Sequence, residues 1–165
     1  MIELDARLTE RIRIAEKPGA LRTLAAFLAH SGDSWFWLAG LGILWLVGNA
    51  YWKHLALILI LSILVTAGVV FIIKFTVRRS RPQGEWGKFY RSTDPHSFPS
   101  GHAVRSMMIA VVTLGLGPLW LGWVLIVWAP LVGLARVAMG VHYLSDVLAG
   151  MILGVLLGLG VLLLV

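Results

Sequence analysis

The sequence predicts an all-α integral membrane protein, a helical bundle of about five transmembrane helices plus an N-terminal amphipathic helix. Three observations lead to this fold class. Only 13% of the 165 residues are charged, against about 25% in an average soluble domain. The mean hydropathy is +0.87, and several apolar stretches reach the length of about 20 residues that crosses a bilayer core. A soluble chain of this size could not bury so much apolar surface.

The N-terminal region is expected to lie on the membrane surface. Residues 3–16 place Leu4, Leu8 and Ile12 at helical spacing with charged residues between them, and Pro18 interrupts the pattern. A soluble helical cap packed on the bundle is the alternative. We predict a single membrane-embedded domain over residues 1–165, in which 1–33 form the interfacial region and 34–165 the transmembrane core.

Apolar stretches separated by polar residues predict the spans: 35–52, 55–73, 106–135 and 147–165. Lys53 and His54 are expected to form a tight turn between the first two. A single helix over the third stretch would be roughly 45 Å long, too long for a core of roughly 30 Å. The Gly-Pro break within residues 115–118 therefore predicts a helical hairpin and a total of five spans.

Five spans would gather nearly every polar residue at one membrane face, because the N-terminal region, the 75–100 loop and the 136–146 turn then share a side. Basic residues dominate the segment 74–105, with seven basic against two acidic: Lys74, Arg78, Arg79, Arg81, Lys88, Arg91 and Arg105 against Glu85 and Asp94. Positive charge confined to one loop between spans suits an anionic headgroup or a phosphate and argues against nucleic acid as a partner.

Three clusters of polar residues are expected at that face: Lys74, Arg81 and Pro82; Pro99, Ser100, Gly101 and His102; and Arg136, His142 and Asp146. One lysine and two arginines form a cage suited to a tetrahedral oxyanion. Ser100 adds a hydroxyl donor, and Gly101 lets the backbone at a helix start come close to a ligand. The clusters therefore predict a phosphate-binding site.

Two histidines give this site its predicted chemistry. His142 and Asp146 are four residues apart at the start of a helix, so they share a face. Asp146 can accept a proton from one ring nitrogen of His142, which leaves the other nitrogen as a nucleophile. His102, on another helix, is then available as general acid. This arrangement suits a double-displacement phosphoryl transfer, and we expect neither a metal nor another cofactor.

The three clusters, in this order, resemble those of the type 2 phosphatidic acid phosphatases (PAP2), which share a core with vanadium-dependent haloperoxidases. The resemblance covers residues 55–165, and Ala135 replaces the serine that usually precedes the arginine. It implies that His142 becomes a phosphohistidine, that Asp146 supports it and that His102 protonates the leaving group. It also implies the residues that hold the phosphoryl group: Lys74, Arg81, Ser100, Gly101 and Arg136. Family members are generally metal-independent and usually have six spans.

The predicted function is that of a metal-independent membrane phosphatase for a lipid phosphate or pyrophosphate. Candidate substrates are phosphatidate, phosphatidylglycerol phosphate, a polyprenyl pyrophosphate and a phosphorylated glycolipid. A lipid phosphotransferase and a non-catalytic lipid-phosphate binding or transport protein are the alternatives. A hydrolase based on Ser100 is disfavoured because the G-x-S-x-G elbow is missing. The substrate and the oligomeric state stay open.

The remaining polar residues receive simpler interpretations. Arg78 and Arg79 are expected to contact headgroups or anchor a helix end. Three histidines are expected to be structural: His30, His54 and His96. The aromatic and basic run at 86–91 predicts an interface belt that also frames a lipid entrance. The protein is expected in the cell (inner or plasma) membrane. By resemblance its site faces outside the cytoplasm, although the positive-inside rule points to the opposite side.

Overall fold

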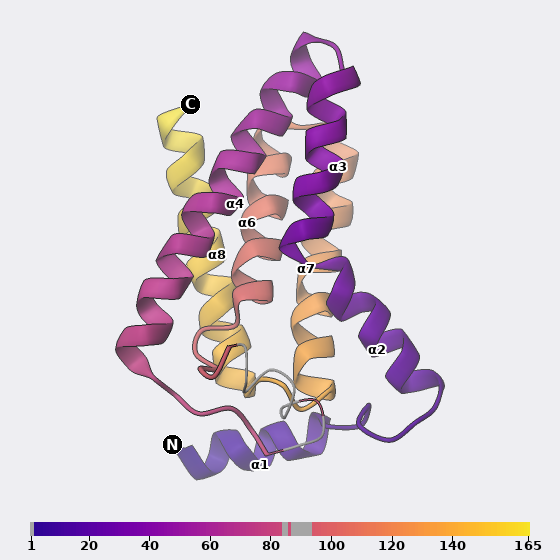
Figure 1. Cartoon of the computed structure of the whole chain (residues 1–165), viewed down its shortest axis with the longest axis vertical. Helices are drawn as coiled ribbons and strands as arrows, with labels where there is room; N and C mark the ends of the chain where they lie inside the picture. The colour runs from indigo at the N-terminus through magenta and orange to yellow at the C-terminus, as the bar shows by residue number, and fades with distance from the viewer. Residues whose placement is uncertain (1, 84–85, 87–93) are drawn as a thin grey trace.

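The computed structural model describes residues 2–83, 86 and 94–165, and every regular element in this part of the chain is a helix. The helices, in order, are α1 (Ile2–Ile12), α2 (Ala20–Ser31), α3 (Ser34–Val47), α4 (Ala50–Val77), α6 (Gly101–Leu116), α7 (Leu119–Ala138) and α8 (Leu144–Leu164). Figure 1 shows α3, α4, α6, α7 and α8 side by side as an elongated bundle. The predicted all-α membrane bundle is confirmed.

Three of these helices, α4, α7 and α8, are long and apolar enough to cross a membrane by themselves. The shorter apolar helices α3 and α6 lie alongside them. The predicted hairpin is also present, because α6 and α7 are joined through Gly117 and Pro118. A helix therefore stands at each of the five predicted positions.

The predicted turn at Lys53 and His54 is wrong, because both residues lie in the first turns of α4. The turn is formed instead by Gly48, whose N–H donates to the Leu44 carbonyl at 2.8 Å and closes α3. Asn49 then caps α4 by accepting a hydrogen bond from the Trp52 N–H at 3.2 Å. Polar side chains such as those of Lys53 and His54 can stay exposed within the first turns of a helix, so their polarity does not mark a helix end.

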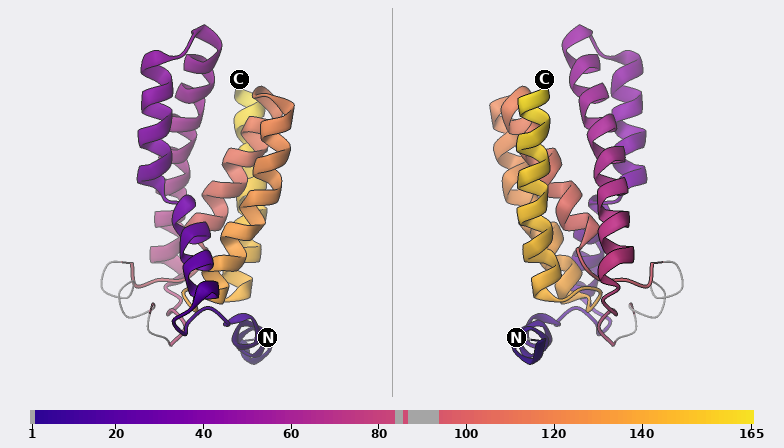
Figure 2. Two further views of the ribbon diagram at one scale, coloured as in Figure 1. Left: turned by 90° about the vertical axis from the view of Figure 1, so that its right-hand side faces the viewer. Right: turned by 90° about the vertical axis from the view of Figure 1, so that its left-hand side faces the viewer.

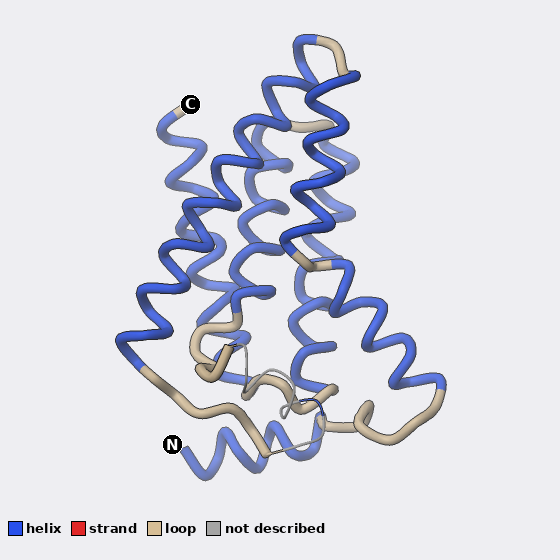
Figure 3. The backbone as a smooth tube through the Cα atoms, viewed as in Figure 1, coloured by secondary structure: helices blue, strands red, loops and turns tan. Residues whose placement is uncertain are grey.

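The two ends of the bundle differ in their connections. Figure 3 shows short turns at one end and long loops at the other, where α4 and α7 end and α6 and α8 begin. Helix α1 lies at this loop-rich end in both views of Figure 2, where it is seen end-on, and Figure 1 shows it running across that end. The predicted collection of polar segments on one side is therefore observed.

Helix α1 ends at Ile12, short of the predicted residue 16, and its polar side chains hold the start of α8. Asp5 accepts a hydrogen bond from the Ser145 N–H at 3.0 Å, and Thr9 accepts one from the Leu144 N–H at 3.0 Å. These N–H groups have no partner within their own helix. The cap interpretation of this region fits these contacts, while exposed Leu4 and Leu8 leave apolar surface for a membrane interface.

Close packing of α6 against α8 depends on three glycines spaced four residues apart: Gly150, Gly154 and Gly158. A Cβ atom at Gly154 would lie 2.5 Å from the Val104 carbonyl oxygen. Small residues at this spacing let two membrane helices approach closely. This packing brings the beginning of α6, with the second polar cluster, beside the beginning of α8, with the third. The 86–91 belt, Trp86 excepted, lies outside the described residues.

Candidate active site

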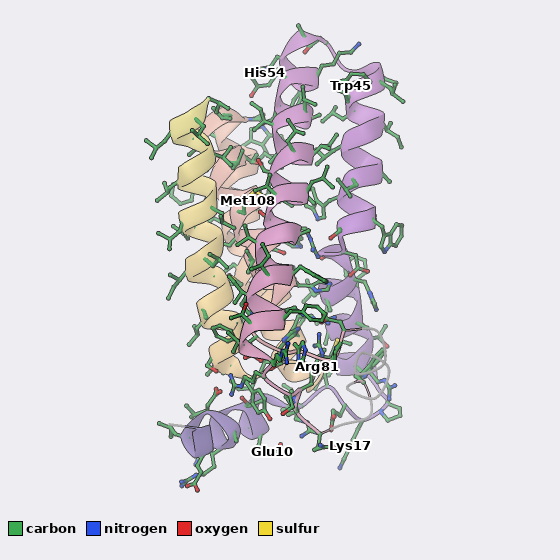
Figure 4. The ribbon with its side chains drawn as sticks, turned by 60° about the vertical axis from the view of Figure 1, so that its left-hand side comes forward. Glu10, Lys17, Trp45, His54, Arg81 and Met108 are labelled. Atoms are coloured by element: carbon green, nitrogen blue, oxygen red, sulfur yellow. The ribbon has the colours of Figure 1, made fainter. Side chains whose placement is uncertain are left out.

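A cavity of about 330 Å³ opens at the loop-rich end of the bundle. Six predicted site residues line it: Lys74, Arg81, Gly101, His102, Arg136 and His142. One wall is apolar and consists of α4 side chains, including Ile63, Val70 and Phe71. Figure 4 shows Arg81 at this end, far from His54 and Trp45 at the other. The cavity therefore joins a cationic floor to an apolar wall.

His142 occupies the short connection between α7 and α8, and its side chain is buried. Its Nε2 lies 3.2 Å from Nη1 of Arg81, while its Nδ1 faces Oδ2 of Asp146 at 3.7 Å. The second distance is too long for a hydrogen bond but places the carboxylate behind the ring. Burial lowers the pKa of His142 well below its ordinary value, and the positive charges of Arg81 and Arg136 lower it further. The ring is therefore neutral at physiological pH.

The Asp146 carboxylate is held by hydrogen-bond donors from other residues. Its Oδ2 accepts a hydrogen bond from the Tyr143 N–H at 2.9 Å, as part of a capping box at the start of α8. Its Oδ1 accepts one from Arg79 at 2.7 Å. The side chain is fully buried, and a buried carboxylate needs such partners to remain charged.

The interpretation of Arg79 as a headgroup contact or anchor is wrong. Its guanidinium bonds to Asp146, donates to Asp5 at 2.6 Å and lies 4.0 Å above the Tyr143 ring. Burial alone would lower the pKa of Arg79, but the carboxylates of Asp5 and Asp146 raise it, so the side chain stays charged. Nothing in the sequence near Arg79 signals these partners, because Asp5 and Asp146 lie in other segments of the chain.

The two cations of the first cluster share a partner that the sequence did not predict. Lys74 donates to the Asp94 carboxylate and to the His96 carbonyl, the latter at 3.0 Å. Arg81 donates to Oδ2 of Asp94 and, through Nε, to the Asp94 carbonyl, both at 2.7 Å. Burial lowers the pKa of Arg81, and Asp94 opposes this effect. A carboxylate thus occupies the cage that was predicted for a phosphate.

The second cluster leads into the first turn of α6, which begins at Gly101, and contacts the third cluster. The Ser100 N–H donates to the Asp146 carbonyl at 3.0 Å. The Ser100 hydroxyl is buried, and no described residue forms a hydrogen bond with it. Gly101 and His102 face the cavity, whereas Ser100 and Asp146 do not line it. His102 also contacts a residue that the sequence did not suggest, because its Nε2 lies 2.7 Å from Oδ1 of Asp33.

All eight predicted site residues therefore gather at one end of the bundle. Arg136 is buried on the last turn of α7, next to the Ala135 that replaces the usual serine. A neutral imidazole beside three cations can attack phosphorus, and a second imidazole on the same cavity can transfer a proton. Within the described part of the chain, no three His, Cys, Asp or Glu side chains are arranged to hold a metal ion.

The chain is similar in sequence to known proteins. A family model described as the PAP2 superfamily matches residues 55–165. An undecaprenyl-diphosphatase of Sulfolobus acidocaldarius is 31% identical over 139 residues, which cover 81% of this chain and 66% of that protein. A decaprenylphosphoryl-5-phosphoribose phosphatase of Mycobacterium tuberculosis is 32% identical over 168 residues, 94% of this chain and 86% of that protein.

Two solved structures share the fold. A PAP2-type phosphatidylglycerolphosphate phosphatase from Bacillus subtilis superposes with a TM-score of 0.76 at 24% identity, covering 96% of this chain and 83% of that one. LpxE from Aquifex aeolicus superposes with a TM-score of 0.76 at 25% identity, covering 96% of this chain and 94% of that one. Both likenesses include helices that precede residue 55.

Proposed function

Because this chain belongs to the PAP2 superfamily, we propose that it hydrolyses the phosphate ester or diphosphate of a membrane lipid through a phosphohistidine at His142. One observation carries the proposal: Nε2 of His142 faces the cationic cavity beside Arg81, while Nδ1 faces the Asp146 carboxylate. A binding or transport protein would need the cations but no imidazole held in this way.

The reaction has two steps. In the first, Nε2 of His142 forms a bond to phosphorus, and the bond between phosphorus and the leaving oxygen breaks as His102 gives that oxygen a proton. In the second, water attacks the phosphohistidine and gives a proton to His102, so that phosphate, the neutral imidazole of His142 and the protonated imidazole of His102 are regenerated. Lys74, Arg81 and Arg136 stabilise the charge on the phosphoryl oxygens in both steps. The family resemblance implies that Ser100 and Gly101 hold the same group.

The substrate is an amphiphile, because the cavity joins cations to an apolar wall on α4. The headgroup would bind among the cations, and the hydrocarbon would follow the α4 side chains into the bilayer. Both sequence relatives above are named for phosphates linked to polyprenyl lipids. We therefore propose a polyprenyl-linked phosphate or diphosphate as the first substrate to test.

The test is phosphate release by the purified protein in detergent, in the presence of EDTA. His142→Ala should abolish release, and the wild type should accumulate an acid-labile phosphoprotein that this variant lacks. His54→Ala is the matched control, because His54 is exposed at the opposite end of the bundle. Unchanged release by His142→Ala would exclude the mechanism. Phosphoryl transfer to an added lipid alcohol, with no free phosphate, would indicate a phosphotransferase instead.

We also propose that the protein resides in the cell membrane with the site outside the cytoplasm, as the resemblance implies. The chain has no cysteine, so a single introduced thiol reports one position. Gln83 is exposed at the loop-rich end and Lys53 at the other, so Gln83→Cys and Lys53→Cys place the thiol on opposite sides. A membrane-impermeant thiol reagent applied to intact cells should label only Gln83→Cys. Labelling of only Lys53→Cys would place the site in the cytoplasm.

A further inference from the structure

The residue that contacts the proposed general acid belongs to a segment outside the matched family region. Asp33 lies between α2 and α3, and its Oδ1 is 2.7 Å from Nε2 of His102 on α6. The family model begins only at residue 55. Asp33 also does not cap α3 with its side chain, although it occupies the capping position. Its carboxylate instead reaches across to α6.

The backbone that carries Asp33 is held firmly against α6 and α7. Arg105, one helical turn after His102, donates through Nε to the Gly32 carbonyl at 2.9 Å. Trp128 on α7 donates to the Ser31 hydroxyl at 2.9 Å. Gly32 is required by close packing, because a Cβ atom there would lie 2.8 Å from a methyl carbon of Val132. The position of the Asp33 carboxylate is therefore fixed before a substrate binds.

This contact determines which nitrogen of His102 can serve the substrate. A carboxylate accepts a hydrogen bond, so Nε2 carries a proton in the contact with Asp33. The other nitrogen, Nδ1, is then the atom available to the leaving oxygen. Burial opposes the charge on Asp33, yet the hydrogen bonds to His102 and His30 lower its pKa well below the ordinary range. The carboxylate is therefore ionised at every pH at which the protein would work.

Charge is the second reason for the contact. Arg105 and Arg136 both act electrostatically on His102, and Asp33 acts on it with the opposite sign. Without Asp33, a protonated imidazole would feel the positive charges of both arginines without this opposing carboxylate. Asp33 has one further histidine partner, because its Oδ2 lies 3.0 Å from Nδ1 of His30. The His30 side chain is half exposed and does not line the cavity.

We infer that Asp33 is a positioning residue for His102: it selects the tautomer, orients the ring and balances the charge of the general acid. The inference rests on the proposed function, because it requires His102 to protonate the leaving group. It assigns a catalytic purpose to the connection between α2 and α3. His30 binds the other oxygen of Asp33 from the surface and is not needed for this role.

The test compares two substrates that need different amounts of acid catalysis, decyl phosphate and 4-nitrophenyl phosphate. The alkoxide of the first must be protonated as it leaves, whereas nitrophenolate leaves without a proton. The measured quantity is kcat/KM, which covers the steps up to departure of the leaving group. Asp33→Asn should lower kcat/KM for decyl phosphate by about 10–100-fold and for 4-nitrophenyl phosphate by less than about threefold. Asp33→Glu should restore part of the loss.

The ratio of the two losses does not depend on how much protein is folded, because a misfolded fraction lowers both equally. Equal losses for Asp33→Asn on both substrates would mean a structural role and overturn the inference. His30→Gln, which keeps a hydrogen-bonding side chain, is the matched control and should leave the ratio unchanged. A selective loss for His30→Gln as large as that of Asp33→Asn would also overturn it.

His102→Ala separates this inference from the proposed function. If this variant loses decyl phosphate hydrolysis selectively while Asp33→Asn does not, the general acid stands and the role of Asp33 is wrong. If His102→Ala loses activity toward both substrates equally, or if His142→Ala remains active, the proposed mechanism itself is wrong. Each outcome therefore identifies which of the two statements fails.

Discussion

Arg79 bonds to Asp146 at 2.7 Å, although the two residues lie 67 positions apart and Arg79 belongs to none of the three polar clusters. The same guanidinium reaches Asp5 on α1. One side chain therefore connects the N-terminal helix, the loop after α4 and the carboxylate behind the proposed nucleophile. Its removal would leave a buried carboxylate with one donor fewer, and such a group either moves or takes up a proton.

We predict that Arg79→Gln lowers kcat by about 10–100-fold, a loss in the range seen when a residue that orients a catalytic ligand is removed. KM should change little, because Arg79 does not line the cavity. Steady-state kinetics of the purified variant would measure both. Arg78→Gln is the matched control, since Arg78 is the exposed neighbour and its side chain donates to the nearby Phe75 carbonyl. Similar losses for both variants would contradict the prediction.

The contact of Asp94 with Lys74 and Arg81 predicts competition with the substrate. Phosphate must replace the Asp94 carboxylate at these cations, and the neutral amide of Asn binds them more weakly than a carboxylate. Asp94→Asn should therefore lower the inhibition constant of inorganic phosphate, by about three- to tenfold. Competitive inhibition assays would measure it, with Glu3→Gln on α1 as a charge-matched control. A raised inhibition constant would show that Asp94 instead holds the cations in their binding positions.

The lowered pKa of His142 predicts activity at acidic pH. Since only the neutral imidazole is nucleophilic, a pKa well below 6.5 keeps the nucleophile available as the pH falls. The acidic limb of kcat/KM should therefore lie below pH 6.5, the ordinary value for histidine. Arg81→Gln removes a positive neighbour and should move this limb to higher pH, apart from its effect on binding.

Two substrates whose phosphates titrate at different pH values separate the enzyme from the substrate in that profile. The assignment to His142 would be refuted if the pH of the acidic limb changed only with the pKa of the substrate phosphate. It would also be refuted if Arg81→Gln did not shift the limb.

The glycines of α8 predict a local difference in stability. Gly154→Ala places a Cβ atom 2.5 Å from the Val104 carbonyl oxygen, whereas Gly160→Ala meets no atom within 4 Å. Overpacking of this kind typically costs about 1–3 kcal/mol. Thermal unfolding in detergent should therefore show a lower Tm for Gly154→Ala. Gly160→Ala should equal or exceed the wild type, because alanine favours a helix. Equal Tm values for the two variants would contradict the packing.

Much of the fold could be predicted from the sequence because a bilayer requires long apolar helices, and these are visible in the order of residues. The residues at which helices begin and end were harder to predict. Lys53 and His54 looked like a turn because they are polar, but the local chemistry of Gly48 and Asn49 ends one helix and begins the next. Polarity indicates where a side chain can be exposed, whereas capping groups decide where hydrogen bonding stops.

The predicted site residues could be named because each cluster is short and local in the sequence. Asp33, Arg79 and Asp94 could not, because each contacts residues from a different part of the chain. An isolated aspartate or arginine near a span end is typical of a membrane interface. Only the folded chain brings Asp33 to His102, Arg79 to Asp146 and Asp94 to Lys74 and Arg81. Contacts between residues far apart in the sequence depend on the three-dimensional structure and cannot be inferred from residue types alone.

The capping of α8 by Asp5 and Thr9 has a consequence for biosynthesis. The ribosome makes α1 long before α8. The Asp5 carboxylate and the Thr9 hydroxyl can therefore bond to the start of α8 only after the four membrane helices between them have been made. A nascent chain that stops after α7 would lack both Asp146 and the amides that hold α1 in place. The proposed mechanism needs Asp146, so it predicts that hydrolytic activity arises only after translation has passed the start of α8.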